Sequence, residues 1–415
     1  MVPEVYGEDS LKLRAASITS SKEVLGVLFL CLFIDSIGYG IVVPILSNYV
    51  LSMGASDFDL ALIFAAFAIV QLFTAVPFGL FSDRYGRKRF MMGGMLLLAA
   101  SFLYYPFAKS VLALVTCRAV QGLAASATWS SALALVADTY PGSDKGEKLG
   151  IANGAVGLGS IAGPVVGGVL GGINFGLPFF IIGSVAFAAF IYMLIRLRLS
   201  GKGAVEASIP YREMLGGAIR VRNVLIVVFI NNMIAIFFGF VEPLMPPYLT
   251  GRFNMSSAEI GLFFGGAFLA FAVFQPIVGR MSDRYGRKVF IVSGLVALCL
   301  LSPLIPYASS VALLFLILGV TGIFWAFAFT PLMPLAVESL RSKNMESFGT
   351  TSGLFNIAYT MGYSIGPILG ALITSYFGFE SIFWVFSGML FVIIIFTQTL
   401  ISEKGIFVGK FSKKR

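Results

Sequence analysis

The sequence predicts an all-α integral membrane protein of twelve spanning helices, arranged as two pseudo-symmetric six-helix bundles. Three observations predict this fold: an apolar composition, a series of membrane-length apolar segments, and an internal repeat. Of the 415 residues, 58% are hydrophobic and only 12% are charged, whereas soluble domains are typically about 25% charged. A soluble core of this length cannot bury so much apolar surface. The composition therefore excludes a cytosolic enzyme, a secreted disulfide scaffold and a disordered regulator.

Twelve apolar segments each approach or exceed the roughly 20 residues that a spanning helix needs. They cover residues 24–50, 58–81, 90–108, 110–137, 148–171, 177–196, 223–249, 258–281, 289–307, 311–337, 348–373 and 380–401. The first is not expected to be a cleavable signal, because Asp35, Pro44 and a long apolar continuation do not fit a short apolar region before a cleavage site.

The basic residues predict the orientation of these spans. Of the 29 Lys and Arg residues, all except Lys109, Arg118 and Arg252 fall in the tails or in the even-numbered connections. By the positive-inside rule, both termini are expected in the cytoplasm. This loop bias also accounts for the net charge of +9 without any nucleic-acid binding. We expect a multi-pass protein of the cell membrane, with an organellar membrane as the alternative.

The chain repeats itself across a charged central loop. GLFSDRYGRKRFM (79–91) recurs as GRMSDRYGRKVFI (279–291), GSIAGPVVGG (159–168) recurs as GYSIGPILGA (362–371), and Asp138 is matched by Glu338. Three matches at nearly one offset indicate a duplicated unit, as in many secondary transporters with a midplane site. The expected division is a cytoplasmic tail (1–21), a first bundle (22–196), a cytoplasmic linker (197–222), a second bundle (223–402) and a basic cytoplasmic tail (403–415).

Several kinds of site are missing from the sequence. Histidine is absent, and Cys31, Cys117 and Cys299 lie in apolar segments, so neither a metal site nor a disulfide framework is expected. There is no Gly-Lys-Ser/Thr phosphate loop for ATP-driven transport, and no Ser/His/Asp or Cys/His set for catalysis. We therefore expect no enzyme and no cofactor, and any proton chemistry falls to carboxylates.

Three charged residues lie inside apolar spans. Asp35 and Glu242 each occupy the first span of their half, and carboxylates at membrane depth are functional candidates by default. Arg118 lies in the fourth span, where an unpaired charge costs about 2.5–3.5 kcal/mol on insertion scales. It is expected to face the bundle interior or a partner and to influence nearby carboxylates. Purely structural roles remain the alternative for all three, and Pro243 and Pro246 predict an irregular helix beside Glu242.

Two further motifs stand out. In the repeated loop, Gly79 is expected to let the helix end pack tightly, and Asp83 to cap a helix or pair with an Arg. The loop residues are Gly79, Asp83, Arg84, Gly86, Arg87 and Lys88, repeated as Gly279, Asp283, Arg284, Gly286, Arg287 and Lys288. In the fifth span a row of small residues predicts close helix packing. It consists of Gly159, Gly163, Pro164, Gly167 and Gly168.

These motifs resemble the major facilitator superfamily over essentially the whole of 22–402. The resemblance implies that Asp83 and Asp283 belong to a charge relay that locks and releases the halves during alternating access. Arg118-Ala-Val-Gln-Gly resembles a second family motif, in which the Arg is linked to proton transfer. The glycine row resembles the motif associated with antiporters. Asp35-x-x-Gly-x-Gly-x-x-x-Pro fits the twelve-helix drug/proton antiporter branch.

Within that branch the nearest resemblance is to the vesicular monoamine carriers, through residues 29–50, 241–249 and 359–367. Those carriers exchange amines for protons, and Asp35 and Glu242 match two of their essential acids. Phe67 stands where that group has a Lys, and Asn356 where it has an Asp. The proton network is therefore expected to be simpler, and export of a lipophilic cation or drug is favoured over faithful amine transport.

Together these patterns predict a proton-coupled antiporter that exports organic cations, amines or lipophilic drugs by alternating access. Its expected partners are the bilayer, protons and an organic cation or amphiphile; it is expected to be a monomer driven by the proton gradient. The expected substrate or proton site comprises Asp35, Glu242, Arg118, Asn356, Tyr39, Phe67, Tyr359 and Tyr363. A proton-coupled symporter of a sugar or small metabolite and a non-transporting sensor are the alternatives.

Overall fold

The computed structural model describes residues 21–140, 144–197, 216–217, 219–343 and 348–401, which form helices and no strand. Twelve helical stretches among them are long and apolar enough to cross a membrane. The first half contains α2 (Ser21–Ser52), α3 (Asp57–Tyr85), α4 (Arg87–Tyr104), η1 (Tyr105–Phe107), α5 (Val111–Thr139), α6 (Asp144–Ile173) and α7 (Gly176–Arg196). The second contains α9 (Arg222–Phe253), α10 (Ser257–Tyr285), α11 (Arg287–Leu301), η2 (Ser302–Tyr307), α12 (Val311–Phe329), α13 (Leu332–Arg341), α14 (Phe348–Phe377) and α15 (Ser381–Leu400).

The number of predicted spans is confirmed, and the differences lie at their ends. The tenth span is divided into α12 and α13 around Thr330 and Pro331. Helix α9 is continuous through Pro243 and Pro246, so these prolines do not end the helix beside Glu242, and its predicted irregularity stays a prediction. The predicted tails and linker lie largely outside the described residues, and the boundaries of the predicted divisions remain predictions.

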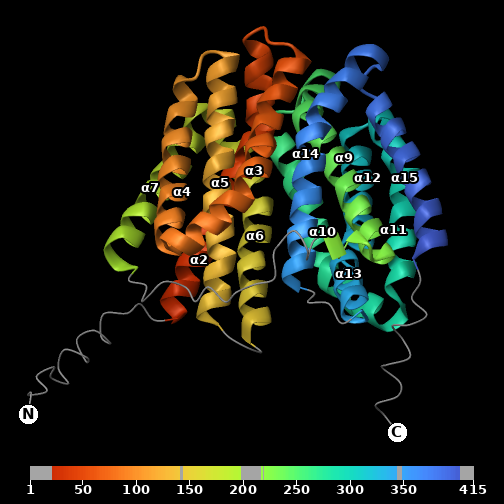
Figure 1. The fold of residues 1–415 in the computed structure, drawn as a ribbon. Helices are drawn as coiled ribbons and strands as arrows, with labels where there is room; N and C mark the ends of the chain where they lie inside the picture. The colour runs from red at the N-terminus through yellow and green to blue at the C-terminus, as the bar shows by residue number, and fades with distance from the viewer. Residues whose placement is uncertain (1–20, 141–143, 198–215, 218, 344–347, 402–415) are drawn as a thin grey trace, which may run out of the picture.

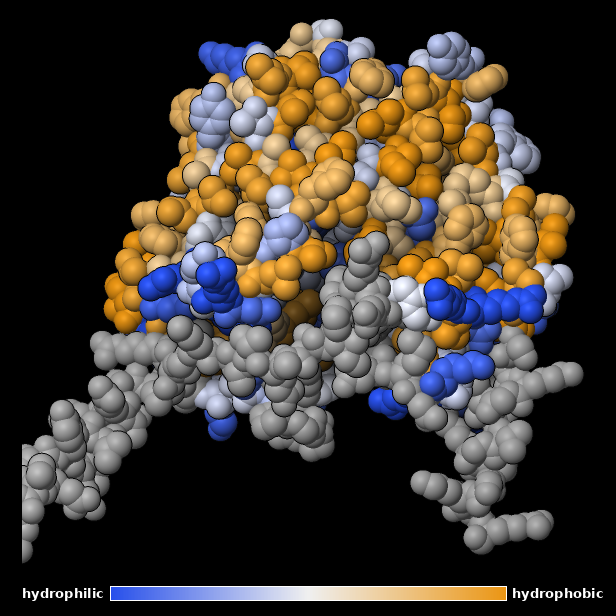
Figure 2. Space-filling view, in the orientation of Figure 1, coloured by the Kyte–Doolittle hydropathy of each residue, from blue (hydrophilic) through white to orange (hydrophobic). Residues whose placement is uncertain are grey.

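The two halves stand side by side as two bundles (Figure 1). The start of α2, the end of α15 and the α3–α4 and α10–α11 turns lie at one end, which we call the basic end because these turns hold the repeated Arg and Lys residues. The other is the opposite end. Figure 2 shows a broad apolar surface above hydrophilic side chains gathered toward the basic end. This distribution is typical of a protein whose apolar band faces lipid.

The duplication extends to the helix caps. Ser56 and Asp59 form a capping box at the start of α3, and Ser256 and Glu259 form the same box at the start of α10. Such side chains satisfy backbone N–H groups that have no partner within the helix. Ser110 and Ser310 likewise cap α5 and α12. The repeated sequence therefore fixes equivalent helix starts in both halves.

Close backbone packing joins α6 to α2 and α14 to α9. A Cβ atom added to Gly163 would lie 2.7 Å from the carbonyl oxygen of Ile37, and one added to Gly366 would lie 2.6 Å from that of Ile236. Larger side chains would force these helices apart. The two helix pairs are equivalent in the repeat, and they hold the acid-bearing helices α2 and α9 in place.

Candidate functional site

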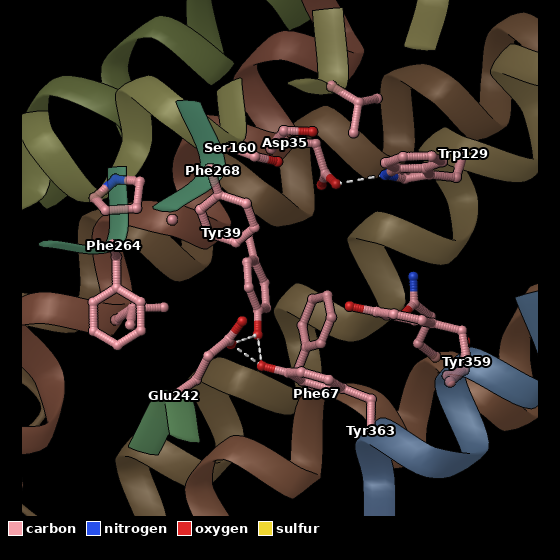
Figure 3. Close-up of a pocket in the computed structure, with 17 residues that line it drawn as sticks. Asp35, Tyr39, Phe67, Trp129, Ser160, Glu242, Phe264, Phe268, Tyr359 and Tyr363 are labelled. Carbon is pink, nitrogen blue, oxygen red and sulfur yellow. Dashed lines mark hydrogen bonds between the residues drawn. The ribbon is translucent and has the colours of Figure 1, made fainter. Parts of the chain in front are cut away.

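A cavity of about 200 Å³ lies between the two halves. Helices α2, α3, α5 and α6 of the first half and α9, α10 and α14 of the second supply its walls. The site residues among its lining are Asp35, Tyr39, Phe67, Pro164, Glu242, Tyr359 and Tyr363. Figure 3 shows the two acids on either side of Tyr39, with aromatic rings filling much of the wall. The cavity therefore brings most of the predicted site residues together.

Asp35 is held by an indole from another helix. Its carboxyl group is on α2, and Nε1 of Trp129 on α5 donates a hydrogen bond of 2.7 Å to Oδ2 (Figure 3). Asp35 is only 6% exposed, and a buried carboxyl group needs such a donor. Trp129 is not among the site residues predicted from the sequence. Its one signal is that it is one of three Trp residues in the chain and lies within an apolar span.

Glu242 accepts hydrogen bonds from both halves. The hydroxyl group of Tyr39 on α2 donates to Oε2 at 2.5 Å. The hydroxyl group of Tyr363 on α14 donates to the same oxygen and also contacts the hydroxyl group of Tyr39. Glu242 itself is 4% exposed. The carboxyl group and two hydroxyl groups therefore form one polar cluster across the boundary between the halves, as the dashed lines in Figure 3 show.

Arg118 lies behind this cluster rather than against an acid. Its Cζ atom is 4.8 Å from the ring centroid of Phe67 and 5.2 Å from that of Tyr39, a geometry that favours cation–π attraction. Phe64 supplies a third ring at 5.1 Å, and Nη1 donates to Oε1 of Gln121 at 2.9 Å. Nε and Nη2 have no hydrogen-bond partner among the described residues. The guanidinium group of Arg118 therefore packs against Phe67 and Tyr39, two rings that line the cavity.

Besides Arg118, one predicted site residue is absent from the cavity lining, Asn356. Its side chain is exposed, and its Oδ1 accepts a hydrogen bond of 3.2 Å from Thr360, which does line the cavity. Residues that sequence analysis missed in the lining are Ser36, Gly40, Val43, Gln71, Trp129, Val156, Ser160, Phe264, Phe268 and Thr360. The polar group of Gln71 within an apolar span was the available signal for one of them.

The repeated loops form ion pairs within each half. Arg87 pairs with Asp83, and its Nε donates to Oδ2 of Asp138 at 3.1 Å. Arg287 pairs with Asp283 at 2.9 Å and with Glu338 at 2.7 Å. The two acids matched in the repeat, Asp138 and Glu338, thus bind equivalent Arg residues. These bonds fix the ends of α3, α4 and α5, and of α10, α11 and α13, and a role in locking the halves stays a prediction.

The glycines of these loops differ from the expectation. A Cβ atom at Gly79 would lie 3.8 Å from Ser130, an ordinary van der Waals distance, so tight packing at Gly79 is wrong. The constrained positions are Gly86 and Gly286, whose φ angles are 103° and 105°. Residues with side chains rarely adopt these angles. Glycine is therefore required at the turn between the helices. The flanking Lys88 and Lys288 contact backbone carbonyl groups of Leu194 and Gln398.

The glycine row of α6 contacts both halves. Gly159, Gly163 and Gly167 pack against α2, whereas Gly168 packs against α10, where an added Cβ would lie 2.2 Å from the carbonyl oxygen of Ser257. Pro164 also contacts α10, at Gly261. The glycine row therefore packs α6 against its own half and, through Gly168, also against α10 of the other half.

The two halves contact each other at the opposite end. At the opposite end, Nδ2 of Asn48 donates to Oγ1 of Thr250 at 2.9 Å, and Gly168 touches Ser257. On the same face of α6, Ser160 lines the cavity. Farther toward the basic end, Gly154 and Gly150 have open space beside them. The contacts between the halves at Asn48 and Gly168 therefore lie on the opposite-end side of the cavity.

Comparison with known proteins agrees with this architecture. The sequence profile described as Major Facilitator Superfamily matches residues 28–241 and 225–406. The chain belongs to this superfamily. Its family resemblance and its fold, two six-helix bundles with twelve spans, are thereby confirmed.

Relatives and solved structures of the superfamily resemble this member along most of its length. The MFS-type transporter SLC18B1 of Homo sapiens is 26% identical over 362 residues, 82% of this chain and 78% of its own. Quinolone resistance protein NorA of Staphylococcus aureus is 24% identical over 348 residues, 83% and 89% of the two chains. A bacterial homolog of the human lysosomal transporter Spinster, solved in an inward-facing conformation, has a TM-score of 0.79 at 15% identity, covering 91% of this chain and 96% of that one.

Proposed function

We propose that this superfamily member is a proton-coupled antiporter that exports organic cations, amines or lipophilic drugs by alternating access. The observation that carries the proposal is a cavity between the halves with two carboxyl groups among aromatic rings. Carboxylates attract a cation by charge, and rings attract it through their π faces. The same carboxyl groups bind protons. Cation and proton can therefore compete for one site, which is the requirement for exchange.

Asp35 is proposed as the group for which cation and proton compete, with Glu242 as the second acid. A cation at Glu242 would compete with the hydroxyl group of Tyr39 for its carboxyl oxygen. Since Tyr39 belongs to the other half, occupancy of the site changes a bond that joins the halves. A ligand shifts a conformational equilibrium only through such differential contacts. Arg118 acts on the same cluster through the ring of Tyr39.

The name of one relative, Quinolone resistance protein NorA, supports a drug as the transported compound. We further propose a monomer in the cell membrane, powered by the proton gradient without a cofactor, with the basic end in the cytoplasm. Single cysteines at Lys202 and Lys109 should then react with impermeant reagents from opposite sides; reaction from one side would contradict this topology. Position 202 lies outside the described residues.

Purified protein in proteoliposomes with an acidic lumen tests the transport reaction. On addition of a fluorescent lipophilic cation, an antiporter accumulates the cation while protons leave the lumen. Proton movement in the same direction as the ligand would identify a symporter and overturn the proposal. Saturable binding without flux of either species would identify a sensor.

A further inference from the structure

A second cavity, of about 180 Å³, lies inside the second half. Its walls come from α9, α10, α12 and α15, with smaller parts of α11, η2 and α14. Aromatic rings dominate the lining, among them Phe237, Phe238, Trp325 and Phe386. No Asp, Glu, Lys or Arg is among the lining residues. A cavity of this kind offers few partners to water and suits an apolar group.

This apolar cavity adjoins the central one. Phe264, Phe268 and Tyr359 line both cavities. Tyr359 stacks on Tyr363 with centroids 6.0 Å apart, and Tyr363 donates to Glu242. The two cavities are therefore separated by aromatic rings that lie beside the cluster of Glu242, Tyr39 and Tyr363. A ligand whose charged group lies in the central cavity would therefore have the apolar cavity directly beyond these rings.

Comparison of the two repeats indicates which residues leave room for the apolar cavity in the second half. Positions 200 apart are equivalent here, because Gly94 packs on α5 as Gly294 packs on α12. In the first half Phe102 and Tyr105 are completely buried. The equivalent positions in the second half are Ser302 and Ile305, both of which line the apolar cavity. The first half thus places two large rings where the second half has smaller side chains and a cavity.

The size of the apolar cavity indicates what it can hold. An engineered protein cavity of about 150 Å³ lined by apolar side chains stays dry and binds benzene, and this one is slightly larger. We propose that it binds the apolar group, an aromatic ring or short alkyl chain, of the amphiphilic cation whose charged group binds in the central cavity. The proposal rests on the proposed function and specifies the substrate class as a cation with one apolar arm.

Chain-length dependence tests this assignment. The probes are alkyltrimethylammonium ions from ethyl to octyl, titrated onto the full chain in lipid nanodiscs. In the wild type, affinity should rise by about fourfold per methylene until the cavity is full. Ser302→Phe and Leu318→Phe fill the cavity from different helices, so the octyl ion should lose at least tenfold in affinity while the ethyl ion binds as before. Ser302→Ala is the matched control and should retain the wild-type series.

The possible outcomes distinguish failure of the cavity assignment from failure of the antiporter proposal. If both folded filling variants keep the wild-type chain-length series, the cavity does not hold the apolar arm and the assignment is wrong. If they flatten the series but proteoliposomes show no proton exchange, the cavity assignment stands and the antiporter proposal fails. Nanodiscs with brominated acyl chains test a lipid occupant. The fluorescence of Trp325, measured as the difference from Trp325→Phe, is quenched if a brominated acyl chain occupies the cavity. Quenching that the octyl ion does not relieve would overturn the assignment.

Discussion

Tyr39 on α2 donates a hydrogen bond of 2.5 Å to Glu242 on α9, 203 positions away in the chain. The two residues belong to different halves, and each comes from the first helix of its half. Their bond lies beside the cavity and not at the surface. A ligand or proton that changes the state of Glu242 therefore changes a contact between the halves directly.

Tyr39→Phe should weaken the attachment of the halves in this conformation. The substitution removes the hydroxyl group but keeps the ring that Arg118 contacts. A hydrogen bond to a charged group contributes about 1.5–3 kcal/mol, which corresponds to a shift of about 10- to 150-fold between conformations. Accessibility of a cysteine in the cavity, measured from each side, reports the shift. Tyr359→Phe, in the same cavity, is the control, and equal behaviour of both variants would contradict the role of this bond.

Asp35→Asn should abolish proton-driven transport and leave the protein folded. The amide cannot exchange a proton, and its Oδ1 can still accept the bond from Trp129. Neutralising a group in an apolar span relieves a burial cost rather than creating one. Size-exclusion elution and cation uptake along a pH gradient measure the two properties. Wild-type, pH-dependent uptake by the variant would show that Asp35 is structural.

Asp83→Asn should alter the transport rate and the accessibility of cavity cysteines more than equilibrium affinity for the substrate. Its ion pair with Arg87 is partly exposed, and such pairs contribute about 0.2–1 kcal/mol, enough to shift conformations only a few-fold. Asp283→Asn should act in the same direction but more weakly, because Asp283 is 55% exposed and Asp83 40%. Asp57→Asn, at the other end of α3, is the control. A large affinity loss with unchanged accessibility would exclude a gating role.

Gly168→Ala should oppose closure at the opposite end. The added Cβ would lie 2.2 Å from the carbonyl oxygen of Ser257, and overpacking of this kind typically costs about 1–3 kcal/mol. The cost falls on the conformation in which α6 and α10 touch, so cavity cysteines should become more accessible from the opposite end. Gly172→Ala, on the same helix with open space beside it, should behave like the wild type. Matching effects of the two substitutions would contradict this explanation.

The features that the bilayer imposes locally could be predicted from the amino-acid sequence alone. A spanning helix must be long and apolar, and its backbone must be satisfied within the helix. These demands are visible residue by residue, so the twelve spans, the duplication and the depth of Asp35 and Glu242 could all be predicted. The equivalent roles of Asp138 and Glu338 followed from the repeat, because duplicated residues occupy equivalent positions in both halves.

The contacts between side chains of different helices could not be predicted in the same way. When a helix is apolar on all sides, its hydropathy does not predict which face points toward the bundle interior. The hydrogen bond from Trp129 to Asp35 and the contacts of Arg118 with aromatic rings could therefore not be predicted from hydropathy. The bond from Tyr39 to Glu242 depends on how two separately packed halves approach each other. Closure through Gly168 at the opposite end depends on the same approach. Such contacts arise from the placement of whole bundles, which no local stretch of the sequence specifies.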